Sequence, residues 1–304
     1  MRIVSLLPSA TEMICGLGLR DQLVGVSHEC DFPASVAALP KVTRSFFPAD
    51  ATSAEIDQIV RQKVDSSAAL YSLDTQALLD LRPDVIVTQS LCDVCAVSMD
   101  QVQAVADALP CPPTIVPLEP TSIDDVMDAV RQISAVVGCE DRAGQYVESL
   151  RNRMTAVIQR SGGTTNVPRV MLLEWIDPPF SAGHWNPELV SMAGGREMIG
   201  RSGHRSTAVP WDSVIQADPE VMVIACCGFT VKRAMQDMPI LCSQPDWGSL
   251  ACVRTRRVHV VDGSAYFNRP GPRLVDSLEI LAHTIHPDVH PLPPGLKPAV
   301  ATER

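Results

Sequence analysis

The sequence predicts an α/β protein built from two lobes, each with a parallel sheet, joined by a single long rigid helix. Three observations lead to this fold class. Short β-branched runs alternate with helical patterns over residues 2–119, two helical segments follow each other over 122–160, and the alternation then resumes at 169. Alternation of strands and helices is typical of a parallel sheet with helices on both faces.

The first lobe, residues 1–121, contains four apolar runs rich in β-branched residues. The expected strands are residues 2–7, 23–27, 84–89 and 114–119. A helical pattern follows the first strand, where Ser9 and Glu12 have the spacing of a capping box. Helical patterns also precede the third strand and the fourth. We therefore expect a parallel sheet covered by helices.

Residues 122–160 are expected to form the linking helices. The first begins at Ser122, carries two aspartates in its first turn and ends at Gly138. The second runs from about Asp141 to Gln159, which is roughly 30 Å at 1.5 Å per residue. One crossing through a stiff helix predicts two lobes that face each other across a cleft and open only slightly.

The second lobe, residues 161–286, has expected strands at 169–175, 220–226 and 257–263 and a helix that ends near residue 285. Residues 287–304 form a Pro-rich tail that we expect to be disordered. The histidines at 283, 286 and 290 have spacings that suit a metal on a helix. Because Pro287 interrupts that helix, we interpret them as surface residues.

Composition excludes several classes of function. The chain has 304 residues and a net charge of −10, so it lacks the basic footprint of a nucleic-acid-binding protein. No apolar run reaches the roughly 18 residues of a membrane helix, so we expect no membrane insertion. The first residues lack the pattern of a secretory signal. The ten cysteines are sparse, and several lie in apolar segments, which favours a reducing compartment. We therefore expect a cytoplasmic protein, or a periplasmic one if a signal was removed.

Polar and aromatic residues follow the expected strands. Ligands of open parallel sheets bind outside the carboxyl ends of the strands, where the segments here are "PSATE", "HEC", "SLCDVC", "EWIDPPFSAGHW", "CCGF" and "GSAYFNR". Of the 13 Phe, Tyr and Trp residues, six fall in these segments: Trp175, Phe180, Trp185, Phe229, Tyr266 and Phe267. This concentration predicts a flat or apolar ligand. His28, Glu29 and His184 are polar candidates at the same edge.

Motifs along nearly the whole chain, to about residue 285, resemble those of a known family. They include "RIVSLLPSATEM", "LVGVSHECDFP", "LRPDVIV", "WIDPPFSAGHWNPELVSMAGG", "AVPWDSV" and "RPGPRLVD". In these motifs the chain is similar to the cobalamin-binding members of the helix-linked substrate-binding proteins, which serve ABC importers of vitamin B12 and iron chelates. The resemblance implies two Rossmann-like lobes of the periplasmic-binding-protein fold.

The resemblance also implies a ligand and a partner. A corrinoid such as cobalamin, or a related tetrapyrrole or metal chelate, would lie between the lobes. Motif positions that would contact it are Pro8, Ser9, Trp211, Tyr266, Asn268 and Arg269. An ABC transporter permease would dock on an acidic residue of each lobe. In the first lobe Gln76 stands where the glutamate is expected, so Asp74 or Asp80 would have to replace it.

The Cys-x-x-Cys pair Cys92 and Cys95 leaves three interpretations open. With Cys226 or a histidine of the strand-end segments it could ligate a metal, including the cobalt of a corrinoid. A thiol just before a helix is also more reactive, which suits disulfide chemistry. The third interpretation is that these thiols line or pack beneath the ligand site.

Catalytic motifs are absent from the sequence. There is no G-x-S-x-G nucleophile elbow, no glycine-rich fingerprint directly after a strand, and no pair of carboxylates placed for acid–base catalysis. We therefore expect a binding protein that acts as a carrier or with a transporter, and not an enzyme. The alternative is a cytoplasmic thiol- or metal-dependent protein that uses Cys92 and Cys95.

Overall fold

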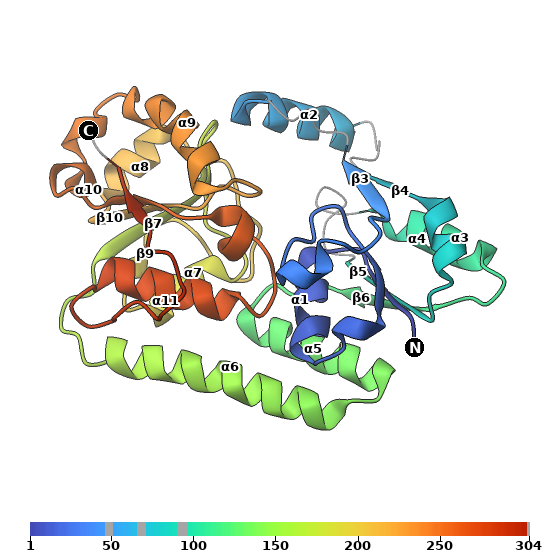
Figure 1. Ribbon diagram of the computed structural model, residues 1–304. Helices are drawn as coiled ribbons and strands as arrows, with labels where there is room; N and C mark the ends of the chain where they lie inside the picture. Colours follow the sequence, from blue (N-terminus) through green and yellow to red (C-terminus); the bar gives the residue numbers. More distant parts are fainter. Residues whose placement is uncertain (46–50, 66–70, 90–96, 303–304) are drawn as a thin grey trace. The chain divides into compact units, whose positions relative to one another are not determined.

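The computed structural model describes residues 1–45, 51–65, 71–89 and 97–302. The chain divides into two compact units (Figure 1). The first unit comprises residues 1–120 and 124–148, and the second comprises 121–123 and 149–304. Each contains a mainly parallel sheet with helices, so the predicted fold class is confirmed.

The first unit is built on a four-stranded parallel sheet in the order β2-β1-β5-β6. Its strands are β1 (Ile3–Ser5), β2 (Leu23–Val26), β5 (Val85–Gln89) and β6 (Thr114–Leu118). Its helices include α1 (Pro8–Gly16), α3 (Thr75–Leu81) and α4 (Met99–Ala108). All five residues of β5 are buried, and its first three, Val85 to Val87, form the apolar run by which the sequence marks this strand.

Helix α1 begins differently from the prediction. Pro8 is its first residue, and Leu7 precedes it with an extended backbone and no side-chain cap. Ser9 and Glu12 therefore lie inside the helix, where only 2% and 5% of their surface is exposed. The expected capping box is wrong because proline, whose fixed φ suits the first helical position, starts the helix one residue earlier.

Three further elements of the first unit escaped the sequence analysis. A short antiparallel pair joins β3 (Thr43–Ser45) to β4 (Tyr71–Leu73), and α2 (Ser53–Asp65) lies between them in the chain. These strands have only three residues each, too few for a hydrophobic period to be recognised.

The two consecutive helices predicted after the first sheet are present. Helix α5 (Ile123–Val137) has Asp124 and Asp125 in its first turn, and Gly138 follows it with a φ of +72°. Helix α6 (Glu140–Ser161) has 22 residues, about 33 Å at 1.5 Å per residue. No helix in the described part of the chain is long and apolar enough to cross a membrane.

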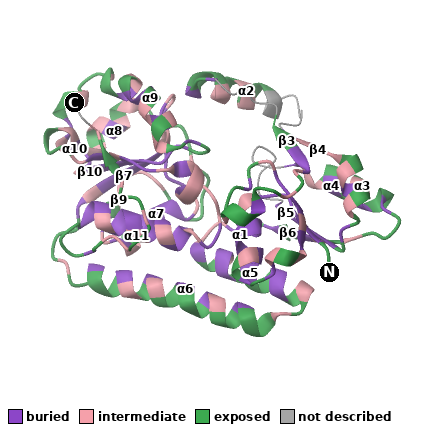
Figure 2. Cartoon of the chain, in the orientation of Figure 1, coloured by how far each residue is buried: buried purple, intermediate pink, exposed green. Residues whose placement is uncertain are grey.

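The second unit has a six-stranded sheet whose central strands are parallel. Its strands are β7 (Arg169–Trp175), β8 (Phe180–Ser181), β9 (Arg196–Glu197), β10 (Val221–Ile224), β11 (Val258–Val260) and β12 (Val300–Ala301). Its helices are α7 (Asn186–Met192), α8 (Trp211–Ala217), α9 (Val231–Cys242), α10 (Ala251–Arg254) and α11 (Leu274–Ile285). The strands β7 and β10 and much of α11 form the buried core of this unit (Figure 2).

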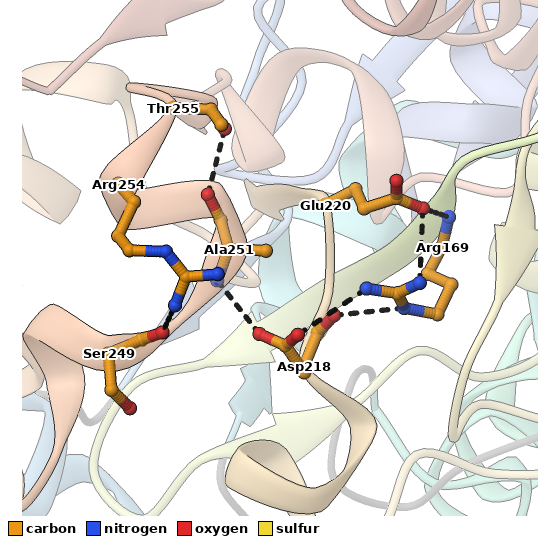
Figure 3. Close-up of polar contacts among 7 residues, drawn as sticks. All are labelled: Arg169, Asp218, Glu220, Ser249, Ala251, Arg254 and Thr255. Carbon is orange, nitrogen blue, oxygen red and sulfur yellow. Dashed lines mark hydrogen bonds and ion pairs between the residues drawn. The ribbon is translucent and has the colours of Figure 1, made fainter.

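Polar side chains fasten the amino ends of β7 and β10 (Figure 3). The Arg169 backbone N–H donates to the Glu220 carboxylate at 2.9 Å, and its side-chain Nε donates to the Asp218 carbonyl at 3.0 Å. The Asp218 carboxylate in turn accepts the Ala251 N–H at 2.8 Å. These contacts fix the register of the strands at the edge opposite their carboxyl-end loops.

The Pro-rich tail is ordered, which corrects the expectation of disorder. Strand β12 pairs antiparallel with β11, so the tail covers an edge of the sheet that would otherwise be open. His286 and His290 are 9% and 2% exposed and are not surface residues. The His290 ring nitrogen Nε2 lies 3.1 Å from the Ser161 hydroxyl, which joins the tail to the end of α6.

Candidate functional site

In the first unit, the predicted site residues lie where β1 and β2 end. His28 follows β2, and its backbone N–H and ring Nδ1 lie 3.0 Å and 2.7 Å from the Thr43 hydroxyl. The ring is also 5.6 Å from that of Tyr71. Burial, and then the charge of Lys41, lower the pKa of His28, which favours a neutral imidazole.

The other candidates of this unit differ in exposure. Glu29 is exposed and lies 4.0 Å from the His28 Nε2 atom. Pro8 is partly exposed at the start of α1, whereas Ser9 is buried. Among these residues, His28, Glu29 and Pro8 offer surface to a ligand in the form that the structure describes.

In the second unit, Trp175 at the end of β7 stacks against the loop after β10. Its ring centroid is 4.8 Å from that of Phe229, and its indole N–H donates to the Asp177 carbonyl at 3.1 Å. The Arg233 guanidinium lies 4.2 Å from the centre of the Phe229 ring and 2.9 Å from the Asp237 carboxylate. Two predicted loops are therefore brought together by an aromatic pair backed by a cation.

A second set of contacts brings in the loop after β11, which forms the π-helix η4 (Gly263–Phe267). The Trp185 indole N–H donates to the Phe267 carbonyl at 2.8 Å. The Asn268 amide donates to the Ala225 carbonyl at 2.7 Å, and the Ser264 N–H donates to the Phe229 carbonyl at 3.0 Å. All three carboxyl-end loops of this sheet are thus hydrogen-bonded to one another.

The six aromatic residues divide into two groups. Trp185, Phe229 and Phe267 are at most 6% exposed and are therefore buried. Trp175, Phe180 and Tyr266 are partly exposed. The sequence analysis counted all six as evidence for a ligand, but the buried three are explained by the need to pack the loops onto the sheet.

Of the remaining predicted residues, Arg269 contacts Tyr266 of the partly exposed group, whereas Trp211 contacts other residues. The Arg273 guanidinium is 5.4 Å from the centre of the Tyr266 ring, and the Arg269 N–H donates to the Tyr266 carbonyl at 3.4 Å. Trp211 begins α8, three residues after the bridge that pairs Ala208 with Phe180. Its ring stacks 6.1 Å from Trp247 and its indole N–H donates to the Pro245 carbonyl at 2.7 Å.

Glu174 is a polar residue of this edge that the sequence analysis missed. Its Oε1 atom accepts the Gly183 N–H at 2.8 Å and the Asn186 amide at 2.7 Å, and its Oε2 atom accepts the Ser206 hydroxyl. Burial raises the pKa of the Glu174 carboxyl, although these hydrogen bonds oppose the shift. A charged residue within "RVMLLEW" was the available signal, because an apolar strand rarely ends on a buried carboxylate without partners.

The metal interpretation gains no support from the described residues. Cys92 and Cys95 lie outside them. Cys226 is fully buried, and burial, with the charge of Asp237, raises the pKa of its thiol, so it stays protonated at neutral pH. Within the described ranges, no group of three or more His, Cys, Asp or Glu side chains is arranged to hold a metal.

The two α/β units, with aromatic loops at the carboxyl edge of a parallel sheet, have the architecture of a two-unit substrate-binding protein. The pattern of the family described as "Periplasmic binding protein" matches residues 3–265. The chain therefore belongs to the periplasmic binding protein family. Members of this family bind substrates and are not enzymes, in agreement with the sequence analysis.

Relatives of known identity are distant but cover the chain almost completely. The Vibrio cholerae protein named "Vitamin B12-binding protein" is 22% identical over 282 residues, which are 91% of this chain and 86% of that protein. A periplasmic heme-binding protein from Pseudomonas aeruginosa superposes with a TM-score of 0.74 at 19% identity and covers 100% of this chain and 99% of its own. The crystal structure of the periplasmic vitamin B12-binding protein of Vibrio cholerae gives 0.66 at 21% identity, covering 93% and 96%. At these identities, the superpositions establish the fold alone.

Proposed function

We propose that this protein is the substrate-binding component of an ABC importer and that its ligand is a corrinoid or a related tetrapyrrole or metal chelate. The observation that carries the proposal is the set of hydrogen-bonded loops at the carboxyl edge of the second sheet, which leaves Trp175, Phe180 and Tyr266 partly exposed. Aromatic faces of this kind suit a flat, largely apolar macrocycle.

Polar groups at the same edge add support. His184 and Arg269 are partly exposed in the loops that carry these rings. Ligand sites of this class combine apolar walls with a few polar groups that fix the orientation of the ligand. The names of the distant relatives, which include vitamin B12-binding and heme-binding proteins, fit the same class of ligand.

Titration calorimetry and visible spectroscopy with aquocobalamin, cobinamide and hemin test the proposal. We expect one of these to bind with heat and a change in its absorption spectrum at micromolar concentration. If all three give neither heat nor a spectral change at tens of micromolar, the proposed class of ligand is wrong.

The transporter partner is also a proposal, supported by the relative from Bacillus subtilis that is named an ABC transporter substrate-binding lipoprotein. Asp74 caps α3 by accepting the Ala77 N–H at 3.0 Å and pairs with Arg44 at 3.6 Å. Asp80 is exposed on the same helix and accepts only the Gln76 amide among the hydrogen bonds described here. Asp80 is therefore our proposed docking acid. Pull-down of the cognate permease with Asp80→Ala tests it.

The cysteines and the proposed importer function favour different compartments. Buried thiols such as Cys226 and Cys252 in apolar surroundings favour a reducing compartment, whereas the distant relatives include a lipoprotein and periplasmic proteins. Fractionation with an antibody against the protein would place it in the cytoplasm or the periplasm.

The thiol- or metal-dependent alternative is tested by metal analysis and by the double variant Cys92→Ser, Cys95→Ser. Unchanged ligand affinity and no bound metal would exclude it.

A further inference from the structure

We propose that Glu174 is a positioning residue for ligand binding, because its carboxylate fixes the loop that presents the His184 imidazole and the Trp185 indole. The inference rests on the proposed function of the carboxyl-end loops of the second unit. Glu174 itself is not proposed to touch the ligand.

The first support is the geometry of the carboxylate. It stands one residue before the end of β7 and reaches two segments that are distant from it in sequence. Through Oε1 it holds Gly183 and Asn186, which flank the His184–Trp185 pair on both sides, at 2.8 Å and 2.7 Å. Through Oε2 it holds the Ser206 hydroxyl. Hydrogen bonds are electrostatically stronger in a desolvated environment than in water, so these bonds hold the two segments firmly.

The second support is the backbone of His184, which has a φ of +48°. Its N–H donates to the His204 carbonyl at 2.6 Å and its carbonyl accepts the Gly203 N–H at 2.9 Å. A residue other than glycine adopts this region only where its surroundings over-determine it, and such residues gather at functional sites. The loop of residues 203–206, which Glu174 also holds, supplies these two partners.

The third support is the lack of space at Gly183. A Cβ atom there would overlap the Ser206 backbone nitrogen and would lie 2.8 Å from the His204 carbonyl oxygen. The two loops therefore touch through their backbones and have to move together. The imidazole of His184 stacks on the Trp185 ring, with centroids 5.4 Å apart and planes at 28°. Displacement of the loop would thus move both rings.

Trp185 connects the loop that Glu174 anchors to the loop after β11. Its indole donates to the Phe267 carbonyl at 2.8 Å in the π-helix η4, which also contains Tyr266. Release of the Glu174 anchor would consequently loosen two of the three carboxyl-end loops, namely the two that carry the partly exposed aromatic residues. This predicts a loss of affinity larger than the removal of a single ligand contact would produce.

Glu197 supplies a matched control within the same unit. It is also a desolvated carboxyl, but it accepts backbone N–H groups of Leu172, Ile199 and Gly200 at 3.1 to 3.2 Å. None of these belongs to residues 183–186 or 203–206. Loss of this carboxylate should therefore lower stability without releasing the loop.

The test compares Glu174→Ala, Glu174→Gln and Glu197→Ala with the wild type. Glutamine keeps the oxygen that accepts from Gly183 and Asn186, and the Ser206 hydroxyl can turn to accept from the new amide. Fluorine NMR of 5-fluorotryptophan-labelled protein, with the Trp185 signal identified from its absence in Trp185→Phe, reports the loop without ligand. Calorimetry with aquocobalamin and hemin measures affinity, and urea unfolding measures stability.

We expect Glu174→Ala to shift or broaden the Trp185 resonance and to weaken affinity by about tenfold or more, as loss of a group that orients a binding residue does. Glu174→Gln should restore both, and Glu197→Ala should change neither while it lowers the urea midpoint. If Glu174→Ala does not fold, Glu174→Asp, which withdraws the carboxylate by one methylene, takes its place.

The proposal is overturned if the Trp185 resonance and the affinity are unchanged without the Glu174 carboxylate, or if Glu197→Ala changes them equally. If the wild type binds none of aquocobalamin, cobinamide and hemin, the proposed function fails. The ligand-free Trp185 resonance still decides in that case whether Glu174 positions the loop.

Discussion

Glu197 should make the stability of the second unit depend on pH, and replacement by glutamine should remove that dependence. Burial raises the pKa of this carboxyl to about 7 from an ordinary value of 4.5, although backbone N–H groups oppose the shift. A carboxyl whose pKa is raised on folding binds its proton more tightly in the folded state than in the unfolded state. Its favourable contribution is therefore complete below pH 4.5 and is lost as the pH rises through 7.

The size of the effect follows from the two pKa values. A difference of about 2.5 units corresponds to roughly 3.5 kcal/mol at about 1.4 kcal/mol per unit. Between pH 5 and pH 8, most of this titrates, so the free energy of unfolding should fall by about 2 to 3 kcal/mol on account of Glu197. Glu197→Gln loses an acceptor for the Leu172 N–H, but that cost is the same at every pH.

Urea unfolding followed by tryptophan fluorescence is the appropriate assay, because all four tryptophans lie in the second unit. Other groups that titrate in this range contribute equally to the wild type and to Glu197→Gln, so they cancel in the difference between the two proteins. We expect the unfolding free energy of the variant, minus that of the wild type, to rise by about 2 to 3 kcal/mol from pH 5 to pH 8. Two parallel pH profiles would show that the Glu197 pKa is not raised.

Three further changes test the packing of the second unit. Trp185→Phe leaves the buried Phe267 carbonyl without its donor and should cost about 1 to 3 kcal/mol of unfolding free energy in urea, with a smaller loss contradicting the role of this bond. Arg153→Met removes the partner of two acids on α11, and because Arg153 is 40% exposed we expect only about 1 to 2 kcal/mol. Gly183→Ala should displace the Ser206 loop and weaken aquocobalamin or hemin binding in calorimetry, whereas unchanged affinity would mean that this loop takes no part in binding.

Much of the fold could be predicted because its central strands are long apolar runs. In β10 every residue is apolar and buried, and β5 begins with three such residues, so the apolar run itself marks the strand. Elements without such an apolar run were missed. The two-residue strands β8 and β9 and the tail strand β12 exist because the chain pairs with β7 or β11, a tertiary contact that local sequence does not encode.

The meeting of the carboxyl-end loops of the second sheet could be predicted from the sequence, but the exposure of their aromatic residues could not. The topological rule placed the site at the carboxyl ends of the strands, and the loops that carry Trp175, Phe229 and Tyr266 do meet there. Hydrogen bonds between the loops, such as that from Trp185 to the Phe267 carbonyl, determine which aromatic residues are buried and which are exposed. The function of Glu174 was hidden for the same reason, because its partners are 9 to 32 residues away.

The difference between strands and loops explains why the chain shares a fold with proteins of about 20% identity that are named for different ligands. A sheet whose strands are apolar on both faces tolerates exchange among Val, Ile, Leu and Met, so the backbone persists while the sequence changes. The loops have no such tolerance, since His184 and Gly183 each require one backbone arrangement. We therefore expect relatives with different ligands to differ at the partly exposed side chains of these loops, such as Trp175 and Tyr266, and to keep the backbone arrangement that Glu174 and Gly183 hold.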